Sequence, residues 1–393
     1  MVTFHPFKGI RATQDKMHLV ASRSFLSYNE KELKEKLTGN PFTFLHVIHP
    51  TQKRDVEEKI KFEEVRSIFD GFVQEGIFIQ EQTPAFYLYR QLKDGKSYLG
   101  WMGGIAVDDY RNGKVKVHEH TIERRENLFA DYLAVTGINA EPVLMFSRFS
   151  NEFKQWTAQI QERDALSDFT TTDKARHTIW VVQSEEDVDR IQGEFSRLNE
   201  VYIADGHHRS ASSERLQRNH PEWEEARYFL SYIIDEDDLT IHPFHRMIAD
   251  IDLREEEILS FLNSKFQPVV ESEIPTSGQF VCLTQNQRSV WSFLPDDKID
   301  PDRIAEQVIT PLTGIVDFRK DKRIRYSEGP KGEQFIQSAI ASGKINCAFL
   351  LSSVTTEELC HIADGGGVMP PKSTYIEPKL RSGLIIYPIS YGI

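Results

Sequence analysis

Val201-Tyr202-Ile203-Ala204-Asp205-Gly206-His207-His208-Arg209 is the stretch from which the fold of this chain can be inferred. The apolar run Val201–Ile203 predicts a short buried strand, and Asp205-Gly206 predicts a sharp turn. A helix is expected from about His208 to Asn219. Backbone N–H groups at the start of a helix lack intrahelical partners and carry partial positive charge, so they bind anions. The stretch therefore predicts a strand, a turn and a helix with a candidate phosphate site between them.

The side chains of this loop suit a phosphorylated ligand. The candidate site comprises Asp205, Gly206, His207, His208, Arg209 and Ser210. Arg209 can contact a phosphate with two parallel hydrogen bonds, and either histidine can carry a proton or donate as a neutral ring near pH 7. Asp205 could orient a substrate amine, hold a metal ion or accept a hydroxyl proton. The alternative is structural: Asp205 caps the helix and the histidines are surface residues.

Outward from the loop, strand and helix patterns alternate. Helices are expected over 54–75, 121–136, 153–164 and 185–198, and strands over 42–48, 85–92, 97–107, 114–117, 143–146 and 177–182. Asp94-Gly95 and Asn112-Gly113 predict hairpin turns. An antiparallel pair is expected over 227–234 and 239–247, a second over 280–283 and 290–293, and a polar link over 167–176. This alternation predicts an α/β fold with mixed sheets.

Composition and charge narrow the class of protein. The chain has 393 residues, of which 39% are hydrophobic, and its net charge of −13 disfavours non-specific binding to nucleic acid or to acidic membranes. Three dispersed cysteines (Cys282, Cys347 and Cys360) make a disulfide framework or a thiolate zinc site unexpected. The N-terminus does not resemble a signal peptide, and no run approaches 18 apolar residues. We therefore expect a cytoplasmic protein.

Three other segments carry candidate site residues. In His118-Glu119-His120-Thr121, at a strand-to-helix transition, Glu119 is a candidate base or metal ligand, or it only starts the helix together with Thr121. The run Met369-Pro370-Pro371-Lys372-Ser373-Thr374 contains phosphate-binding residue types but not the Walker pattern, so it could equally be a stiff surface loop. The candidate substrate-binding residues are His118, Thr121, Arg11, His245 and Arg246.

The loop Asp205–Arg209 resembles the motif of the ParB/sulfiredoxin superfamily, which includes free-serine kinases. The whole chain resembles the domain-of-unknown-function family 1015, which is serine-kinase-like. The supporting segments are Pro6–Arg11, Tyr87–Tyr89, His118–Thr121, Tyr202–Arg209, His245-Arg246, Met369–Thr374, Pro378-Lys379 and Ser382–Leu384. The resemblance implies a ParB/sulfiredoxin-like core over 151–250, with elaborating α/β domains over 1–150 and 251–393.

The relatives imply different activities. Sulfiredoxins use a reactive cysteine where this chain has His207, so sulfinic-acid repair is disfavoured. ParB-type proteins bind DNA, which the acidic composition disfavours. Free-serine kinases keep the Asp-Gly-His-His-Arg loop. Their resemblance implies phosphoryl transfer from ATP or ADP, with Mg²⁺, to a small hydroxyl compound, L-serine first, with a glutamate as base.

For this chemistry, Asp205, His207, His208 and the candidate base Glu119 form the catalytic set, with Asp205 also as the metal ligand. Gly206, Arg209, Ser210, Lys372, Ser373 and Thr374 form the nucleotide-binding set. Two alternatives stay open: a non-catalytic nucleotide-binding regulatory protein, and a hydrolase of nucleotides or phosphate esters. The expected partners are a nucleotide and a small molecule, without nucleic acid or membrane, and a homodimer is left open.

Overall fold

The computed structural model describes residues 1–48, 58–269 and 275–390. Its contacts divide the chain into two compact units: unit 1 comprises Met1–Leu239 with Pro378–Ile393, and unit 2 comprises Thr240–Glu377. Each unit contains mixed helices and sheet, which confirms the α/β class predicted from the sequence. The division into three domains at residues 150 and 250, like the ParB/sulfiredoxin-like core, stays a prediction.

Unit 1 is built on a nine-stranded sheet in the order β6-β11-β8-β12-β5-β4-β10-β9, with β1 beside β5. Its neighbouring strands are antiparallel except for two parallel pairs, β6 with β11 and β8 with β12. The strands are β1 Phe4–His5, β4 Phe86–Lys93, β5 Lys96–Ala106, β6 Val115–Lys116, β8 Val143–Ser147, β9 Ser167–Thr170, β10 Arg176–Val182, β11 Val201–Asp205 and β12 Tyr228–Asp235. Two ribbons pair β2 Ile10–Ala12 with β3 Phe78–Gln80 and β7 Ile138–Asn139 with β20 Tyr387–Pro388.

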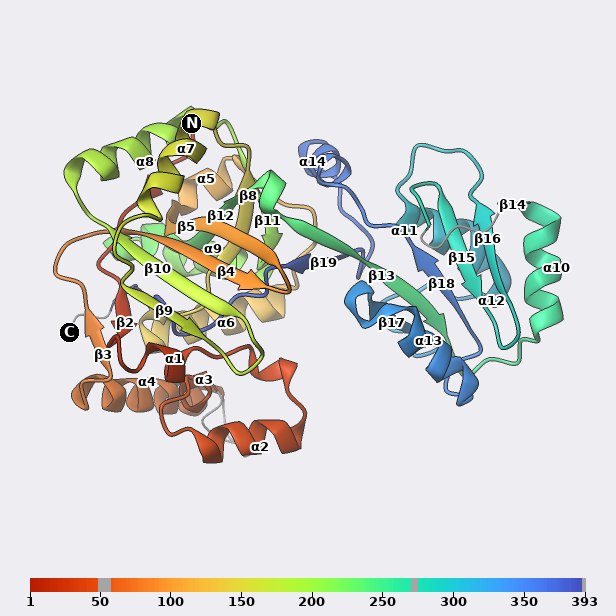
Figure 1. The fold of residues 1–393 in the computed structure, drawn as a ribbon, viewed down its shortest axis with the longest axis horizontal. Helices are drawn as coiled ribbons and strands as arrows, with labels where there is room; N and C mark the ends of the chain where they lie inside the picture. The colour runs from red at the N-terminus through yellow and green to blue at the C-terminus, as the bar shows by residue number, and fades with distance from the viewer. Residues whose placement is uncertain (49–57, 270–274, 391–393) are drawn as a thin grey trace. The chain divides into compact units, whose positions relative to one another are not determined.

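Helices cover this sheet, as Figure 1 shows. They are α1 Met17–Val20, α2 Glu30–Gly39, α3 Leu45–Ile48, α4 Glu58–Gln74, α5 Val107–Arg111, α6 Glu123–Thr136, α7 Asn151–Ile160, α8 Glu185–Arg197 and α9 His207–Asn219, with 3-10 turns η1 Phe25–Ser27, η2 Glu224–Arg227 and η3 Glu236–Asp238. Helix α6 packs against both α9 and α4, and α9 also contacts β8 and β12. The helix that follows the candidate loop is therefore held by a helical neighbour and by the sheet.

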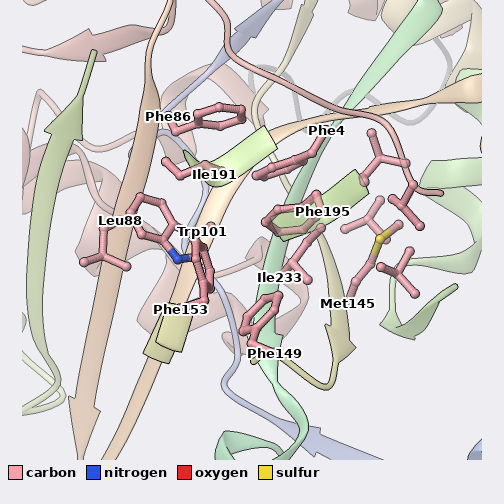
Figure 2. Close-up of a cluster of buried hydrophobic side chains, with 14 of the residues drawn as sticks. Phe4, Phe86, Leu88, Trp101, Met145, Phe149, Phe153, Ile191, Phe195 and Ile233 are labelled. Carbon is pink, nitrogen blue, oxygen red and sulfur yellow. The ribbon is translucent and has the colours of Figure 1, made fainter. Parts of the chain in front are cut away.

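An aromatic core fills one side of the unit 1 sheet (Figure 2). Trp101 of β5 is 1% exposed, and its ring stacks on Trp156 of α7 with centroids 5.6 Å apart. Phe195 of α8 stacks on Phe4, with centroids 4.1 Å apart. Alternate strand residues point to the same face of a sheet, which is why the members of this cluster within each of β5, β8 and β12 are an even number of positions apart. Burial of these side chains holds α7 and α8 against the sheet.

Unit 2 contains a seven-stranded sheet in the order β14-β16-β15-β18-β13-β17, with β19 also paired to β13. Its strands are β13 Thr240–Ile248, β14 Gln267–Pro268, β15 Gln279–Leu283, β16 Arg288–Ser292, β17 Ile324–Glu328, β18 Cys347–Leu351 and β19 Thr374–Glu377. Its helices are α10 Glu255–Lys265, α11 Asp300–Arg303, the π-helical η4 Ile304–Ile309, α12 Thr310–Thr313, η5 Gly329–Lys331, α13 Gly332–Ala341 and α14 Thr356–Asp364. The predicted hairpin of β15 and β16 is confirmed.

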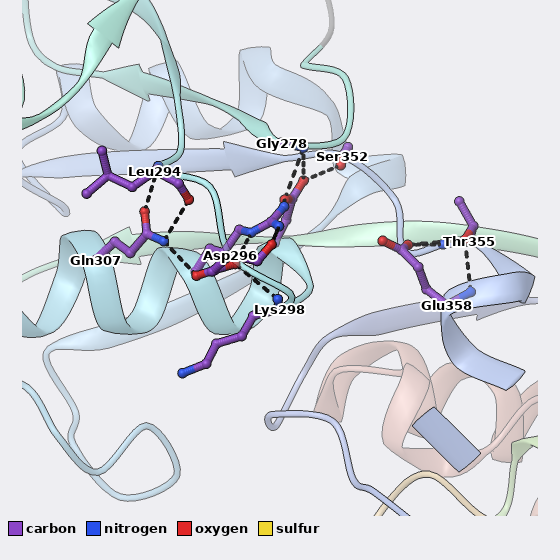
Figure 3. Close-up of polar contacts among 10 residues, drawn as sticks. Gly278, Leu294, Asp296, Lys298, Gln307, Ser352, Thr355 and Glu358 are labelled. Atoms are coloured by element: carbon purple, nitrogen blue, oxygen red, sulfur yellow. Dashed lines mark hydrogen bonds and ion pairs between the residues drawn. The ribbon is translucent and has the colours of Figure 1, made fainter. Parts of the chain in front are cut away.

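A polar network joins loops of unit 2 to the start of α11 (Figure 3). The carboxylate of Asp300 accepts hydrogen bonds from the Gly278 N–H at 3.1 Å and from the Ser352 hydroxyl at 2.8 Å. Asp296 accepts from the Gln307 amide at 2.8 Å. These bonds satisfy polar groups that helix and loop ends would otherwise leave unpaired.

Four local predictions are wrong. Strands β12 and β13 do not pair with each other, since β12 lies between β5 and β8 and β13 pairs within unit 2. The acidic link between them lacks the glycine of a tight hairpin and forms η3. Asn112-Gly113 does not join a hairpin either, because α5 precedes it and β6 runs parallel to β11.

The other two errors concern segments of ambiguous pattern. The apolar run 42–48 forms α3 over Leu45–Ile48, since a short apolar run does not distinguish a strand from a buried helix. The expected polar link over 167–176 contains β9, which pairs with β10. The helix predicted over 54–75 is α4, and residues 54–57 lie outside the described residues. Within the described residues, no helix has the length and apolarity needed to cross a membrane.

Candidate functional site

The candidate loop of unit 1 begins where β11 ends. The pairing of β11 with β8 shifts register between Ile203 and Asp205, so the strand is irregular just before the turn. Such an irregularity re-aims a side chain at a strand end, and the Asp205 side chain is 51% exposed there. Gly206 follows with a φ of 109°, which favours glycine, and α9 starts at His207. The predicted strand, turn and helix are confirmed.

Arg209 lies against this turn and bridges two carboxylates. One guanidinium nitrogen lies 3.4 Å from Asp205 Oδ2, and another lies 3.4 Å from Glu141 Oε2. A Cβ atom on Gly206 would lie 2.9 Å from Arg209 Nε, so glycine allows the guanidinium to approach the backbone closely. The Arg209 side chain remains 25% exposed. A positive charge thus stands beside the N-terminal turn of α9, within reach of solvent.

His207 and His118 form a buried pair behind the loop. The His118 backbone N–H donates to His207 Nε2 at 3.4 Å, and the two rings meet edge to face with centroids 4.4 Å apart. Because Nε2 accepts, the neutral His207 ring is assigned its proton on Nδ1. That nitrogen lies 3.7 Å from Glu119 Oε2. The loop after β6 and the start of α9 therefore bring Glu119, His118 and His207 together.

Burial keeps these histidines neutral. Burial lowers the pKa of His118 to about 4, an effect that the Asp205 carboxylate partly opposes. Burial, reinforced by the neighbouring His118, lowers the pKa of His207 well below its usual value. The pKa of His208 is also lowered, first by burial and then by the Arg125 charge. At neutral pH these rings can donate or accept hydrogen bonds but carry no charge toward a phosphate.

Other predicted residues of unit 1 make mainly structural contacts. Ser210 is buried, and its hydroxyl donates to the His207 carbonyl at 3.0 Å. The Thr121 hydroxyl donates to Glu126, which also pairs with Arg215 of α9 at 3.0 Å. Arg11 lies in β2, where its guanidinium is 2.5 Å from Glu81. The roles of Ser210, Thr121 and Arg11 in ligand binding stay predictions.

The remaining predicted residues belong to unit 2. Arg246 is 1% exposed and donates at 2.8 Å to the carbonyls of Phe244 and Lys372. Burial lowers the pKa of Arg246 to about 10. Lys372 has a φ of 58°, and its ammonium group lies 5.2 Å from the Phe244 ring centre. Arg246 thus holds the backbone of the predicted phosphate-binding segment in place.

Three neighbours of that segment are also engaged within unit 2. The Ser373 hydroxyl donates to the Pro370 carbonyl at 2.8 Å, and Thr374 pairs with Pro243 at the start of β19. His245 Nδ1 accepts from the Leu351 N–H at 3.2 Å. The nucleotide-binding role of Lys372, Ser373 and Thr374 and the substrate role of His245 and Arg246 stay predictions.

Two residues of the loop's surroundings were not foreseen as site residues: Glu141 and Ser382. Glu141 lies two residues before Val143, where the predicted strand begins, but no motif marks it. Only the antiparallel pairing of β8 with β11 brings the start of β8 to the end of β11. Ser382 lies in the C-terminal segment, and its hydroxyl donates to Glu141 Oε1 at 2.7 Å.

The loop suits Mg²⁺ only when the phosphates of a bound substrate supply further ligands to the ion. Across the described ranges, no group of three or more His, Cys, Asp and Glu side chains is arranged to hold a metal ion. Mg²⁺ is commonly held by one or two carboxylates together with substrate phosphates and water. The half-exposed carboxylate of Asp205 suits such a shared site. It does not suit an all-protein metal centre.

Residues 4–316 match the family DUF1015, described as a protein of unknown function. The chain belongs to this family. No curated protein matches the chain.

Several solved structures are similar. A C-terminally truncated SbnI from Staphylococcus aureus has a TM-score of 0.41 and 10% identity over 72% of this chain and 85% of its own. A free serine kinase variant in complex with AMP has a TM-score of 0.36 and 15% identity, covering 72% and 91%. A conserved hypothetical protein from Pyrococcus furiosus has a TM-score of 0.35 and 16% identity, covering 74% and 95%. At these scores the likeness carries no functional argument.

The buried histidines predict that acid destabilises the folded protein. Burial lowers the pKa of His118 and His245 to about 4 and that of His177 to about 3. The unfolded chain protonates these rings near pH 6.5, so stability is full above that pH and is lost as pH falls toward the folded values. Each ring contributes a loss of about 1.4 kcal/mol per pH unit in this window. We expect a clear fall in the urea midpoint between pH 7.5 and pH 5.

Acids whose pKa is raised by burial act in the opposite direction: the pKa of Asp238 is raised to about 6, and the pKa values of Asp300 and Asp302 are raised as well. We expect the histidines to outweigh these acids. His120 is exposed and serves as a control, because His120→Gln should leave the pH dependence unchanged. A midpoint that stays constant from pH 7.5 to pH 5 would contradict the burial of these neutral rings.

Proposed function

We propose that this protein is a small-molecule kinase that transfers a phosphoryl group from ATP or ADP, with Mg²⁺, to a hydroxyl group. Free L-serine, giving O-phosphoserine, is the first candidate acceptor. The observation that carries the proposal is the turn from β11 into α9, where Asp205, Arg209 and Glu119 gather around the N-terminus of a helix of 13 residues. Phosphoryl transfer depends on positioning and on stabilisation of phosphate charge more than on covalent chemistry.

Each group has a role that its surroundings support. The N–H groups of the first turn of α9 and the Arg209 guanidinium would bind phosphate oxygens. Asp205 would share Mg²⁺ with those phosphates or orient the acceptor. Glu119 is half-exposed, with 56% of its side chain accessible, and would accept the hydroxyl proton. A carboxylate in contact with solvent can receive and release a proton in each turnover.

His207 supports this assignment as the donor that orients Glu119. Its Nε2 is engaged by the His118 N–H, so its Nδ1 proton is available to the Glu119 carboxylate 3.7 Å away. At 3.7 Å the two groups lie beyond hydrogen-bond distance, so the half-exposed Glu119 would have to move closer to the ring for the neutral His207 donor to orient it. His208 lies on the first turn of α9, where its ring would add a neutral contact to the transferred group.

The test is a turnover screen of the full chain. The purified protein is incubated with Mg²⁺, ATP or ADP and a panel of small hydroxyl compounds led by L-serine, and phosphorylated products are read by mass spectrometry. We expect product in proportion to enzyme and its loss in Asp205→Ala. Arg218→Ala is the control, since Arg218 is 57% exposed on the last turns of the same helix and should keep full activity.

Other outcomes of this screen assign the protein differently. Nucleotide consumed without any acceptor would make the protein a hydrolase. Thermal stabilisation by one nucleotide without turnover would make it a nucleotide-binding regulatory protein. Full activity in Asp205→Ala would remove the loop from the active site, whatever the reaction.

A further inference from the structure

Glu141 and Ser382 form a chain of contacts that ends on Arg209. The Ser382 hydroxyl donates to one carboxylate oxygen of Glu141 at 2.7 Å, and the other oxygen lies 3.4 Å from a guanidinium nitrogen of Arg209. The two oxygens of Glu141 thus have separate partners. A carboxylate fixed on one side is a better anchor for an arginine than one that is free to rotate.

The backbone around Ser382 is itself held in unit 1. Ser382 exchanges backbone hydrogen bonds with Ser22, at 2.8 and 3.3 Å, and its neighbour Arg381 pairs with Asp173 at 2.6 Å. The Gly383 N–H donates to the Ala140 carbonyl, beside Glu141. The C-terminal segment therefore holds Ser382, the hydrogen-bond donor of Glu141, in a fixed position.

Both carboxylate contacts of Arg209 are 3.4 Å long, so neither contact alone fixes the guanidinium. Its pair with Asp205 spans 3.4 Å and involves a carboxylate that is 51% exposed. A long, partly exposed arginine side chain loses conformational entropy when it is held in one geometry. The guanidinium nevertheless lies close against Gly206, at the helix end where a phosphate would bind.

We propose that Glu141, held by Ser382, is a positioning residue that keeps the Arg209 guanidinium against Gly206, in place to receive a phosphate. This inference rests on the proposed function. It assigns to the C-terminal segment, which returns after unit 2, a part in the phosphate site of the loop.

The test compares the affinity of the full chain for ADP, by calorimetry, in five variants, one of which is Arg209→Ala. Glu141→Ala removes both contacts and should raise the Kd for ADP about fivefold to tenfold, the usual effect of one lost hydrogen bond. Glu141→Gln should recover most of this affinity, since its amide oxygen can accept from Arg209 and its amide nitrogen can donate to Ser382. Ser382→Ala should also raise the Kd for ADP, but by less than Glu141→Ala does. Glu152→Ala, at an exposed pair with Arg190, is the matched control and should equal the wild type.

Rescue by Glu141→Gln separates positioning from the alternatives. If Glu141 merely competed with phosphate for Arg209, both Glu141 variants would bind ADP more tightly than the wild type, and the inference would be overturned. If its role were general stability, the thermal midpoint would fall in both variants while the affinity of the folded protein stayed constant. If Glu141→Ala does not fold, Ser382→Ala carries the same test.

The same measurements distinguish a failure of the proposed function from a failure of the inference about Glu141. If the wild type binds no ADP, both the proposed function and this inference are overturned. If the wild type binds ADP and Arg209→Ala weakens it, yet Glu141→Ala and Ser382→Ala bind as the wild type does, only the inference about Glu141 is overturned.

Discussion

Glu119→Gln should lower kcat for phosphoryl transfer by about 10²–10⁴-fold, because it removes the group proposed to accept the hydroxyl proton. The amide is nearly isosteric with the carboxylate, and its oxygen can occupy the same place, 3.7 Å from His207 Nδ1. The affinity for nucleotide should therefore change little. Steady-state kinetics with the acceptor found by the screen, together with calorimetric titration of ADP, measure the two quantities separately.

The matched control for this experiment is Glu123→Gln. Glu123 lies nearby at the start of α6, its side chain is 79% exposed, and its pair with Arg215 spans 3.7 Å. Its loss should leave kcat unchanged. Equal turnover by Glu119→Gln and the wild type would exclude Glu119 as the base. A large loss of nucleotide affinity with unchanged kcat would assign Glu119 to binding instead.

Trp101→Ala should destabilise unit 1 by about 3–5 kcal/mol, the usual cost of removing a large buried aromatic side chain. Trp101 is 1% exposed at the centre of the sheet, stacked on Trp156 and 5.8 Å from the Phe153 ring. No helix can move far enough to fill the space, because α7 and α8 are held by other members of the same cluster. Urea unfolding followed by circular dichroism measures the change.

Trp101→Phe is the informative comparison. Among the described residues, the Trp101 indole nitrogen has no hydrogen-bond partner, so removing it leaves no other group unsatisfied. The smaller ring keeps an aromatic face toward Trp156 and leaves a smaller cavity, so the cost should be clearly less than that of Trp101→Ala. A similar loss in both variants would show that the volume of the indole, and not the aromatic contact, determines the stability of this core.

Local pattern predicted the elements of this chain better than their pairing. The hairpin at Asp94-Gly95 was correct because a two-residue turn commits its flanking strands to each other. The pairing of β12 with β13 was wrong because the intervening acidic residues form η3, and each strand found other neighbours. Which strands become neighbours depends on contacts far apart in sequence, and no short motif encodes those contacts.

In the candidate site, too, local structure could be predicted from the sequence, whereas contacts between distant residues could not. The position of Asp205, Gly206 and Arg209 at the entrance to a helix was predicted from the residues alone. The approach of Glu119 to His207 depends on β6 running parallel to β11, which places the ends of the two strands at the same edge of the sheet. Sequence spacing alone, with the two residues 88 positions apart, gave no measure of that distance.

The strand, turn and helix of the Asp-Gly-His-His-Arg loop follow from neighbouring residues, because a buried strand, a glycine at positive φ and a helix start are local properties of the backbone. The charge states and partners of that loop depend on how distant segments pack. Burial makes His118 and His207 neutral, and the antiparallel packing of β8 together with the returning C-terminal segment brings Glu141 and Ser382 to Arg209. Desolvation and long-range pairing arise only when distant segments pack. The pKa shifts and the partners of the loop therefore cannot be predicted from neighbouring residues.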